Sequence, residues 1–133
     1  DMLRVILRRI IQFKLILILV YILVLTLGQN IFDILVGPDY RESYFAFIIL
    51  TGGHFILGAY LSVANIAFYG EQSFKLSVTT IISGIFQIGL IILLGKYYGI
   101  EGVALAFLLG SLLKYLLSMA IASLAWKNVR EKC

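Results

Sequence analysis

The feature that most constrains this chain is a series of four long apolar stretches separated by short polar breaks. The stretches cover residues 15–36, 44–69, 74–94 and 102–126. A helix rises 1.5 Å per residue, so about 20 apolar residues cross the hydrocarbon core of a bilayer, which is about 30 Å thick. The chain is 62% hydrophobic and 14% charged, whereas a soluble domain is about 25% charged. Lipid must therefore cover apolar surface that one small core cannot bury.

The breaks predict how the stretches are connected. Residues 37–43, 70–73 and 95–101 all contain glycine, and the first break also contains Pro38. Glycine and proline interrupt helices, and loops this short make consecutive helices antiparallel neighbours. Barrel strands would alternate over about ten residues, whereas these stretches are continuously apolar. We therefore expect an all-α, polytopic integral membrane protein, with four transmembrane helices arranged as two antiparallel hairpins in one bundle over residues 1–133.

The distribution of basic residues predicts the orientation of the chain in the membrane. Cytoplasmic segments of membrane proteins retain positive charge. The side that holds both termini carries Arg4, Arg8, Arg9, Lys14, Lys75, Lys127, Arg130 and Lys132, and the other side has Arg41 and Lys96, offset by Asp39, Glu42 and Glu101. We therefore expect a multi-pass protein with both termini in the cytoplasm. Because the positive charge flanks the apolar stretches, it predicts contact with the lipid bilayer and not with nucleic acid.

Lys114 is the charged residue that most needs an explanation. It lies about 18 Å from the outer end of its predicted helix, which is too deep for the side chain to reach either interface comfortably. A charge at the centre of a membrane helix costs at least about 2.5 to 3.5 kcal/mol on insertion scales. We expect Lys114 to line a water-filled cavity or substrate path, and the alternative is a lysine packed between helices.

Further polar residues are predicted at a similar depth. His54 and Gln87 lie about 15 Å and 12 Å from the outer ends of their helices, which predicts one polar layer with Lys114. On each helix, other polar residues follow at spacings of three and four residues, which places them on the same face as the residue in this layer. The candidate substrate-binding residues are Lys114, His54, Gln87, Asn65 and Ser118. For His54, the alternatives are a hydrogen-bonded buried imidazole and a proton-carrying group.

Small residues predict a packing face on the last helix. Gly102, Ala106 and Gly110 recur at four-residue intervals. Small residues at this spacing let membrane helices approach closely. We therefore expect this face to contact a neighbouring helix.

Enzymatic motifs are missing from the sequence. It has no GxxxxGK[ST], HExxH or CxxC pattern, and only one Cys, Cys133, and one His. These counts exclude metal sites built from several Cys or His residues. A hydrolase built on Ser111 and His54 would need an oxyanion arrangement, which the sequence does not indicate. We expect no enzymatic activity, no metal and no cofactor.

Two segments resemble a known transporter family. Residues 32–43 (FDILVGPDYRES) and 98–111 (YGIEGVALAFLLGS) are similar to outer loops and adjoining helices of polysaccharide repeat-unit flippases of the O-antigen type. These belong to the multidrug/oligosaccharidyl-lipid/polysaccharide exporter superfamily. The resemblance implies that the chain is the C-terminal part of a larger transporter in the bacterial inner membrane. Its partners would be the remaining helices of the parent transporter and a lipid-linked oligosaccharide substrate.

The resemblance also implies a function. Members of the family are thought to flip undecaprenyl-diphosphate-linked sugar units across the cytoplasmic membrane for polysaccharide biosynthesis. Such a substrate needs a cationic, polar-lined cavity, and Lys114 supplies a charge at a suitable depth. Two alternatives come from other classes of protein. One is a small four-helix multidrug exporter, and the other is a membrane assembly subunit whose Lys114 pairs with an acid on a partner helix.

Overall fold

Four long α-helices make up almost the whole chain. The structure, a computed structural model, describes residues 2–132, so Asp1 and Cys133 lie outside the described residues. The elements are α1 (Met2–Leu35), the 3-10 helix η1 (Pro38–Ser43), α2 (Tyr44–Tyr69), α3 (Ser73–Tyr98) and α4 (Ile100–Lys132). All four α-helices are long and apolar enough to cross a membrane, and residues 2–132 contain no strand. The all-α prediction is confirmed.

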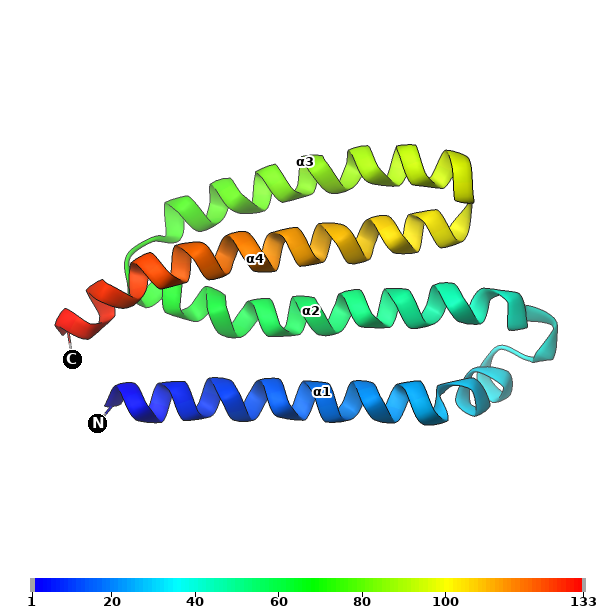
Figure 1. The fold of residues 1–133 in the computed structure, drawn as a ribbon, viewed down its shortest axis with the longest axis horizontal. Helices are drawn as coiled ribbons and strands as arrows, with labels where there is room; N and C mark the ends of the chain where they lie inside the picture. Colours follow the sequence, from blue (N-terminus) through cyan, green and yellow to red (C-terminus); the bar gives the residue numbers. More distant parts are fainter. Residues whose placement is uncertain (1, 133) are drawn as a thin grey trace.

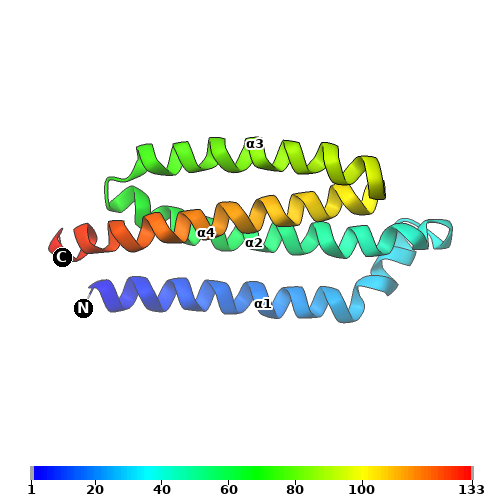
Figure 2. The same cartoon turned by 45° about the horizontal axis from the view of Figure 1, so that its top comes forward.

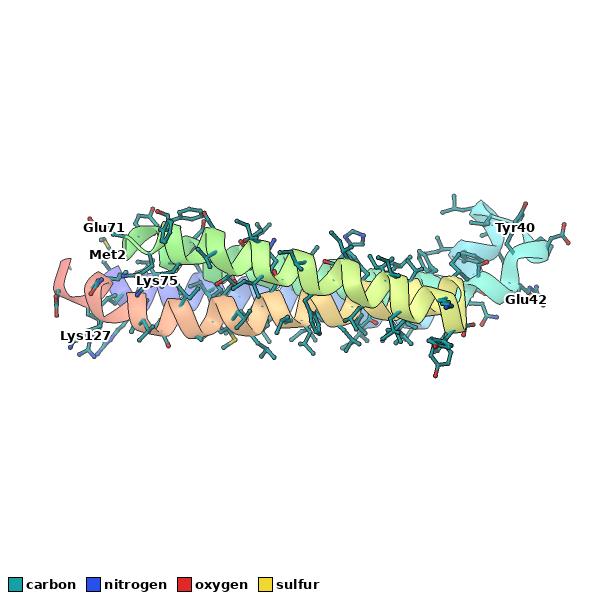
Figure 3. All side chains as sticks on the ribbon, turned by 90° about the horizontal axis from the view of Figure 1, so that it is seen from above. Met2, Tyr40, Glu42, Glu71, Lys75 and Lys127 are labelled. Carbon is teal, nitrogen blue, oxygen red and sulfur yellow. The ribbon has the colours of Figure 1, made fainter. Side chains whose placement is uncertain are left out.

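The helices run between two polar ends. Both termini and the turn between α2 and α3 lie at one end, called here the terminal end, and η1 lies at the opposite end with the turn between α3 and α4, called here the loop end (Figure 1). Figure 3 shows Met2, Glu71, Lys75 and Lys127 near the terminal end, and Tyr40 and Glu42 near the loop end. Labelled charged residues thus lie at the two ends of an apolar bundle.

The order of the helices in space differs from their order in the sequence. α4 packs between α2 and α3, and α1 lies at the edge beside α2 (Figures 1 and 2). The α1–α2 and α3–α4 pairs form the two antiparallel hairpins that the sequence predicts. Helices α2 and α3 are also consecutive, but they make few contacts with each other because α4 packs between them. The expectation that all consecutive helices are neighbours is therefore wrong for this pair.

Three helix boundaries depart clearly from the predicted ones, and one of them is the end of α4, which continues beyond residue 126 to Lys132. Helix α1 begins at Met2 and not near residue 15, because Arg, Lys and Gln are good helix formers and no glycine or proline interrupts the first turns. Helix α3 continues through Gly95 to Tyr98. The turn is made by Gly99, whose φ of 66° lies in the left-handed region that favours glycine.

Small residues on α4 allow it to approach the helices on both sides. A Cβ atom on Gly102 would collide with the carbonyl group of Leu94 on α3, and Ala106 is completely buried. Toward α2, Ala104 packs in a buried cluster with Ala46. The predicted packing face on α4 is confirmed.

Helix α1 is attached mainly at the loop end. Of its residues, Gly28 and Phe32 are buried. The Phe32 ring lies 5.6 Å from the Tyr44 ring and 5.4 Å from the Phe47 ring of α2, between ring centroids. Arg41 of η1 also forms an ion pair with Asp33, with 3.3 Å between Nη2 and Oδ2. Most other side chains of α1 are exposed or half-buried, so its remaining surface is free to contact lipid or other helices.

Candidate functional site

Three helices contribute to one face of α4. Phe107, Gly110 and Lys114 are spaced by three and four residues, which places them on the same side of the helix. The His54 ring of α2 contacts Phe107, and Gln87 of α3 packs against Gly110. The structure therefore brings the predicted polar residues His54, Gln87 and Lys114 to this face, called here the Lys114 face.

Lys114 is half-buried near the middle of α4. Its Nζ atom lies 4.4 Å from the centroid of the Tyr60 ring of α2. An aromatic face attracts a cation and is worth about 2 kcal/mol or more when the cation is desolvated. Among the described residues, no carboxylate lies within ion-pair distance of Lys114. The charge is thus stabilised by a ring and not neutralised by an acid.

His54 is exposed, contrary to the alternative of a buried imidazole. Its ring centroid lies 4.9 Å from that of Phe107, with 49° between the ring planes. The preceding residue, Gly53, faces α4 so closely that a Cβ atom there would lie 2.6 Å from the Phe107 ring. Successive residues in a helix differ by about 100° in direction. Because Gly53 occupies the contact, the His54 side chain lies beside it with an accessible edge.

Gln87 lies where α3 and α4 approach each other closely. It is half-buried, and its Cγ atom would lie 2.7 Å from a Cβ atom on Gly110. The missing side chain of Gly110 therefore makes room for the stem of Gln87. The close contact orders this stem, and the amide group provides donors and an acceptor for a ligand.

Asn65 and Ser118 lie in other surroundings. Asn65 is exposed and lines a groove between α1 and α2 that also contains Arg9 and Ser62. Ser118 is completely buried, and its Oγ atom has no hydrogen-bond partner among the described residues. Helical spacing alone predicts a shared face for Lys114 and Ser118, but their burial differs because neighbouring helices cover only part of that face.

Lys14 is a second lysine that contacts the middle of the bundle, although the sequence places it in the N-terminal flank. The Nζ atom of Lys14 donates a hydrogen bond of 2.9 Å to the Oη atom of Tyr115 on α4. Tyr115 lies about 22 Å from the start of α4 at 1.5 Å per residue, so Lys14 reaches the middle of that helix. Sequence reasoning places Lys14 in the flank before the first apolar stretch, whereas in the structure it lies inside α1, which begins at Met2, and contacts α4. No signal in the sequence pairs Lys14 with Tyr115, because the two residues are far apart in the chain.

An apolar groove adjoins Lys14. This groove, called here the middle groove, has a volume of about 390 Å³ and is bounded by α1, α2 and α4. Its lining residues are Lys14, Leu17, Ile18, Tyr21, Ile22, Gly52, Phe55, Ile56, Ala59, Leu108, Leu112 and Tyr115. Apart from the lysine and two phenol groups, its side chains are apolar, so it suits a hydrocarbon chain better than a sugar.

The ionisable groups show no arrangement suited to metal binding. Among residues 2–132, no three His, Cys, Asp or Glu side chains gather closely enough to hold a metal ion. The interior polar groups described above are cations, an imidazole, amides and hydroxyls, which suit recognition of an anion and of hydroxyl groups. Comparison with protein-family models, with curated proteins and with solved structures finds no match to this chain.

Proposed function

We propose that the chain is part of a non-enzymatic membrane transporter that flips lipid-linked oligosaccharides, such as undecaprenyl-diphosphate-linked sugar units, for polysaccharide biosynthesis. The observation that carries the proposal is that Lys114 lies at mid-depth against the Tyr60 ring without an acidic partner among the described residues. The resemblance of residues 32–43 and 98–111 to repeat-unit flippases supplies the transporter class.

The positions of the acidic residues favour an anionic substrate. The seven acidic residues are Asp1, Asp33, Asp39, Glu42, Glu71, Glu101 and Glu131. All of them lie near helix ends, in turns or at the chain termini, whereas Lys14 and Lys114 contact the middle of the bundle. An interior cation that has only aromatic and hydroxyl partners is incompletely compensated. A diphosphate provides strong acceptors for charge-assisted hydrogen bonds from such a lysine.

The Lys114 face separates charge recognition from sugar recognition. Lys114 binds the diphosphate, and the exposed His54 and the amide of Gln87 hydrogen-bond to sugar hydroxyls. Asn65 lies nearer the terminal end and meets the substrate as it enters or leaves. Because Ser118 is fully buried, it contacts substrate only after α4 and its neighbours have separated. Such rearrangement is part of alternating access.

The remaining helices of the parent transporter complete the cavity in this proposal. His54 has an accessible polar ring in a helix that is apolar enough to cross a membrane. Polar groups at membrane depth normally face protein or a water-filled cavity, because exposure to lipid is costly. We place the protein in the bacterial cytoplasmic membrane with both termini in the cytoplasm, in accordance with its basic flanks.

Two other functions are distinguishable from this one. A dimeric multidrug exporter coupled to protons needs a membrane-buried acid, and the seven acidic positions do not supply one. An assembly subunit would use Lys114 to bind an acidic partner helix, and the exposure of His54 is compatible with a covering helix. In that case, loss of the lysine abolishes assembly, whereas in a transporter it abolishes transport by a normally assembled protein.

The test is translocation of a fluorescent lipid-linked oligosaccharide in proteoliposomes. Lys114→Ala is expected to lower the rate by at least about tenfold, the loss of one hydrogen bond to a charged group, with normal membrane insertion. The matched control is Lys75→Ala, which removes an exposed charge near the terminal end. Transport at the wild-type rate by Lys114→Ala at normal abundance would refute the role of Lys114. If Lys114→Ala instead fails to assemble in the membrane, the assembly subunit is favoured over the transporter.

A further inference from the structure

The middle groove separates two helices that hardly contact each other. Helices α1 and α4 both pack against α2, which lies between them in Figure 1, and few direct contacts join α1 to α4. The hydrogen bond from Lys14 to Tyr115 crosses this gap. All three helices line the groove, and its lining residues from Lys14 to Ile22 span about 12 Å along α1, or about two helical turns. The groove is therefore long enough to receive side chains from two turns of another helix.

Exposed apolar side chains border the groove on both walls. Ile18 and Ile22 of α1 are exposed, and so is Leu112 of α4. On α4 the exposed apolar face continues beyond the groove with Leu116 and Met119, because spacings of four and three residues stay on one side of a helix. In a membrane such a surface contacts either lipid or the apolar side of another helix. The cation at one end of the groove decides between the two.

Lys14 lies too deep in the membrane for a lipid head group. Its partner Tyr115 lies about 22 Å from the start of α4 and about 26 Å from its end, at 1.5 Å per residue. Because the hydrocarbon of one leaflet is about 15 Å thick, the phosphates of both leaflets lie well outside this level. The Lys14 side chain points across to α4 and not toward the terminal end, where a lysine that snorkels would place its charge. A partner for this charge must therefore lie inside the membrane.

The charge of Lys14 is incompletely compensated. Its ammonium group has three donors, and one of them bonds to the Tyr115 hydroxyl. The other phenol in the groove, Tyr21, donates its own hydrogen bond to the Ile48 carbonyl. Among the described residues, Lys14 forms no ion pair. A lysine inside a membrane protein is normally paired with an acid or with backbone carbonyls, and a carboxylate accepts strong, charge-assisted hydrogen bonds from it.

This chain does not supply such a carboxylate. The acidic residues among residues 2–132 lie near helix ends or in turns, and none lies at the level of Lys14. A second copy of the chain would place these residues near the two membrane surfaces in a parallel as well as an inverted orientation. An oligosaccharide is also unsuitable, because apart from Lys14 and two phenols the groove has no side chain that hydrogen-bonds to sugars. The carboxylate must therefore come from a different helix.

The middle groove is separate from the Lys114 face. Lys114 and Tyr115 are consecutive, so their side chains differ by about 100° in direction around α4. Lys114 lies against a ring of α2, whereas Tyr115 meets Lys14 of α1. Neither Lys114 nor His54 lines the middle groove. The groove can therefore be occupied while the Lys114 face remains open.

We infer that the middle groove docks a transmembrane helix from outside residues 1–133, and that this helix carries a glutamate or aspartate at the level of Lys14. Apolar side chains from two turns of that helix fill the groove between α1 and α4. Its carboxylate accepts a hydrogen bond from the Lys14 ammonium group, which Tyr115 holds in position. This interface goes beyond the proposed transport function, which uses the Lys114 face.

Synthetic transmembrane peptides test the inference. Each peptide is a leucine–alanine helix with a nitroxide spin label near its centre, and the three peptides have Glu, Gln or Leu at the central position. In a Trp126→Phe background, Ile18→Trp places a fluorescent reporter in the middle groove. Leu61→Trp places a control reporter at an exposed position in the separate groove of Asn65. Protein and peptide are reconstituted in phosphatidylcholine vesicles at pH 8, and quenching is measured against peptide content.

The Glu peptide is expected to quench the groove reporter at a peptide content at least about fivefold lower than the Gln and Leu peptides, which is the usual strength of a polar contact between membrane helices. The control reporter is expected to show no such difference. Lys14→Gln should abolish the preference for Glu, and Lys14→Arg, which keeps the charge, should retain it. Lys114→Gln is the matched control, because it removes an interior charge outside the groove, and it should also retain the preference.

Four results would overturn the inference. These are equal quenching by the three peptides, a preference for Glu that survives in Lys14→Gln, and a preference that disappears in Lys114→Gln, which would place the acid at the Lys114 face. The fourth is the absence of quenching by any peptide, which would mean that the groove does not accept a helix. The transport assay on Lys114→Ala does not involve the middle groove, so the two proposals fail separately.

Discussion

The Nζ atom of Lys14 donates a 2.9 Å hydrogen bond to Tyr115, and thereby connects the edge helix α1 to α4. The next residue toward the loop end, Lys114, lies against the Tyr60 ring of α2. Two interior cations therefore meet tyrosines at nearly the same depth.

Removal of the Tyr115 hydroxyl should loosen the terminal half of α1. A hydrogen bond to a charged group contributes about 1.5 to 3 kcal/mol, and few other contacts hold this half of the helix. Spin labels on α1 and α4 should show a broader distance distribution in Tyr115→Phe than in the wild type. Tyr60→Phe is the matched control, because it keeps the ring that Lys114 contacts. An unchanged distribution in Tyr115→Phe would mean that the bond does not hold α1.

The α3–α4 contact should discriminate between two glycines. A Cβ atom on Gly102 would collide with the backbone of Leu94, whereas one on Gly84 would meet nothing within 4 Å. Gly102→Ala should lower the free energy of unfolding in detergent by about 1 to 3 kcal/mol, which is the usual cost of overpacking. Gly84→Ala should leave it unchanged or raise it slightly, because alanine favours the helix. Equal effects of the two substitutions would contradict the packing described here.

Two buried serines of α4 should respond in opposite directions. Ser111 Oγ donates a 2.8 Å hydrogen bond to the Phe107 carbonyl, whereas Ser118 Oγ has no partner among the described residues. A hydroxyl buried without a partner costs about 1 to 3 kcal/mol in protein mutational data. Ser118→Ala should therefore maintain or increase the free energy of unfolding, and Ser111→Ala should decrease it. A large loss of stability in Ser118→Ala would show that Oγ has a partner, such as a bound water.

The orientation in the membrane can be measured by cysteine labelling. With Cys133→Ser as background, a cysteine at Glu42 near the loop end should react with an impermeant maleimide added to intact cells. A cysteine at Ser73 near the terminal end should react only after the membrane is opened. This follows if the basic terminal end faces the cytoplasm. The reverse pattern of labelling would contradict the proposed topology.

Much of the fold follows from local features of the sequence. The four apolar stretches predict the four helices, and Gly37 with Pro38 and Gly99 lie at the ends of helices. The position of α4 between α2 and α3 was not predictable from loop lengths. It depends on complementary small residues, such as Ala46 and Ala104, that are far apart in the sequence.

The candidate site was predicted in part. Depth predicts one polar layer that contains His54, Gln87 and Lys114, and in the structure His54 and Gln87 contact Phe107 and Gly110 of α4, one or two turns from Lys114. Depth and helical spacing do not predict that His54 is exposed, because this depends on Gly53 packing against α4. They also miss Lys14, since its depth depends on how far α1 extends and on which helix it faces.

The most direct test of the central claim, that Lys114 binds the anionic group of a lipid-linked substrate, is an equilibrium binding measurement. Undecaprenyl-diphosphate-linked oligosaccharide is titrated into nanodiscs that contain wild-type protein, Lys114→Gln or Lys75→Gln. We expect Lys114→Gln to weaken binding by at least about tenfold and Lys75→Gln to bind as the wild type does. Equal affinity of Lys114→Gln and wild type would show that Lys114 does not bind the anionic group.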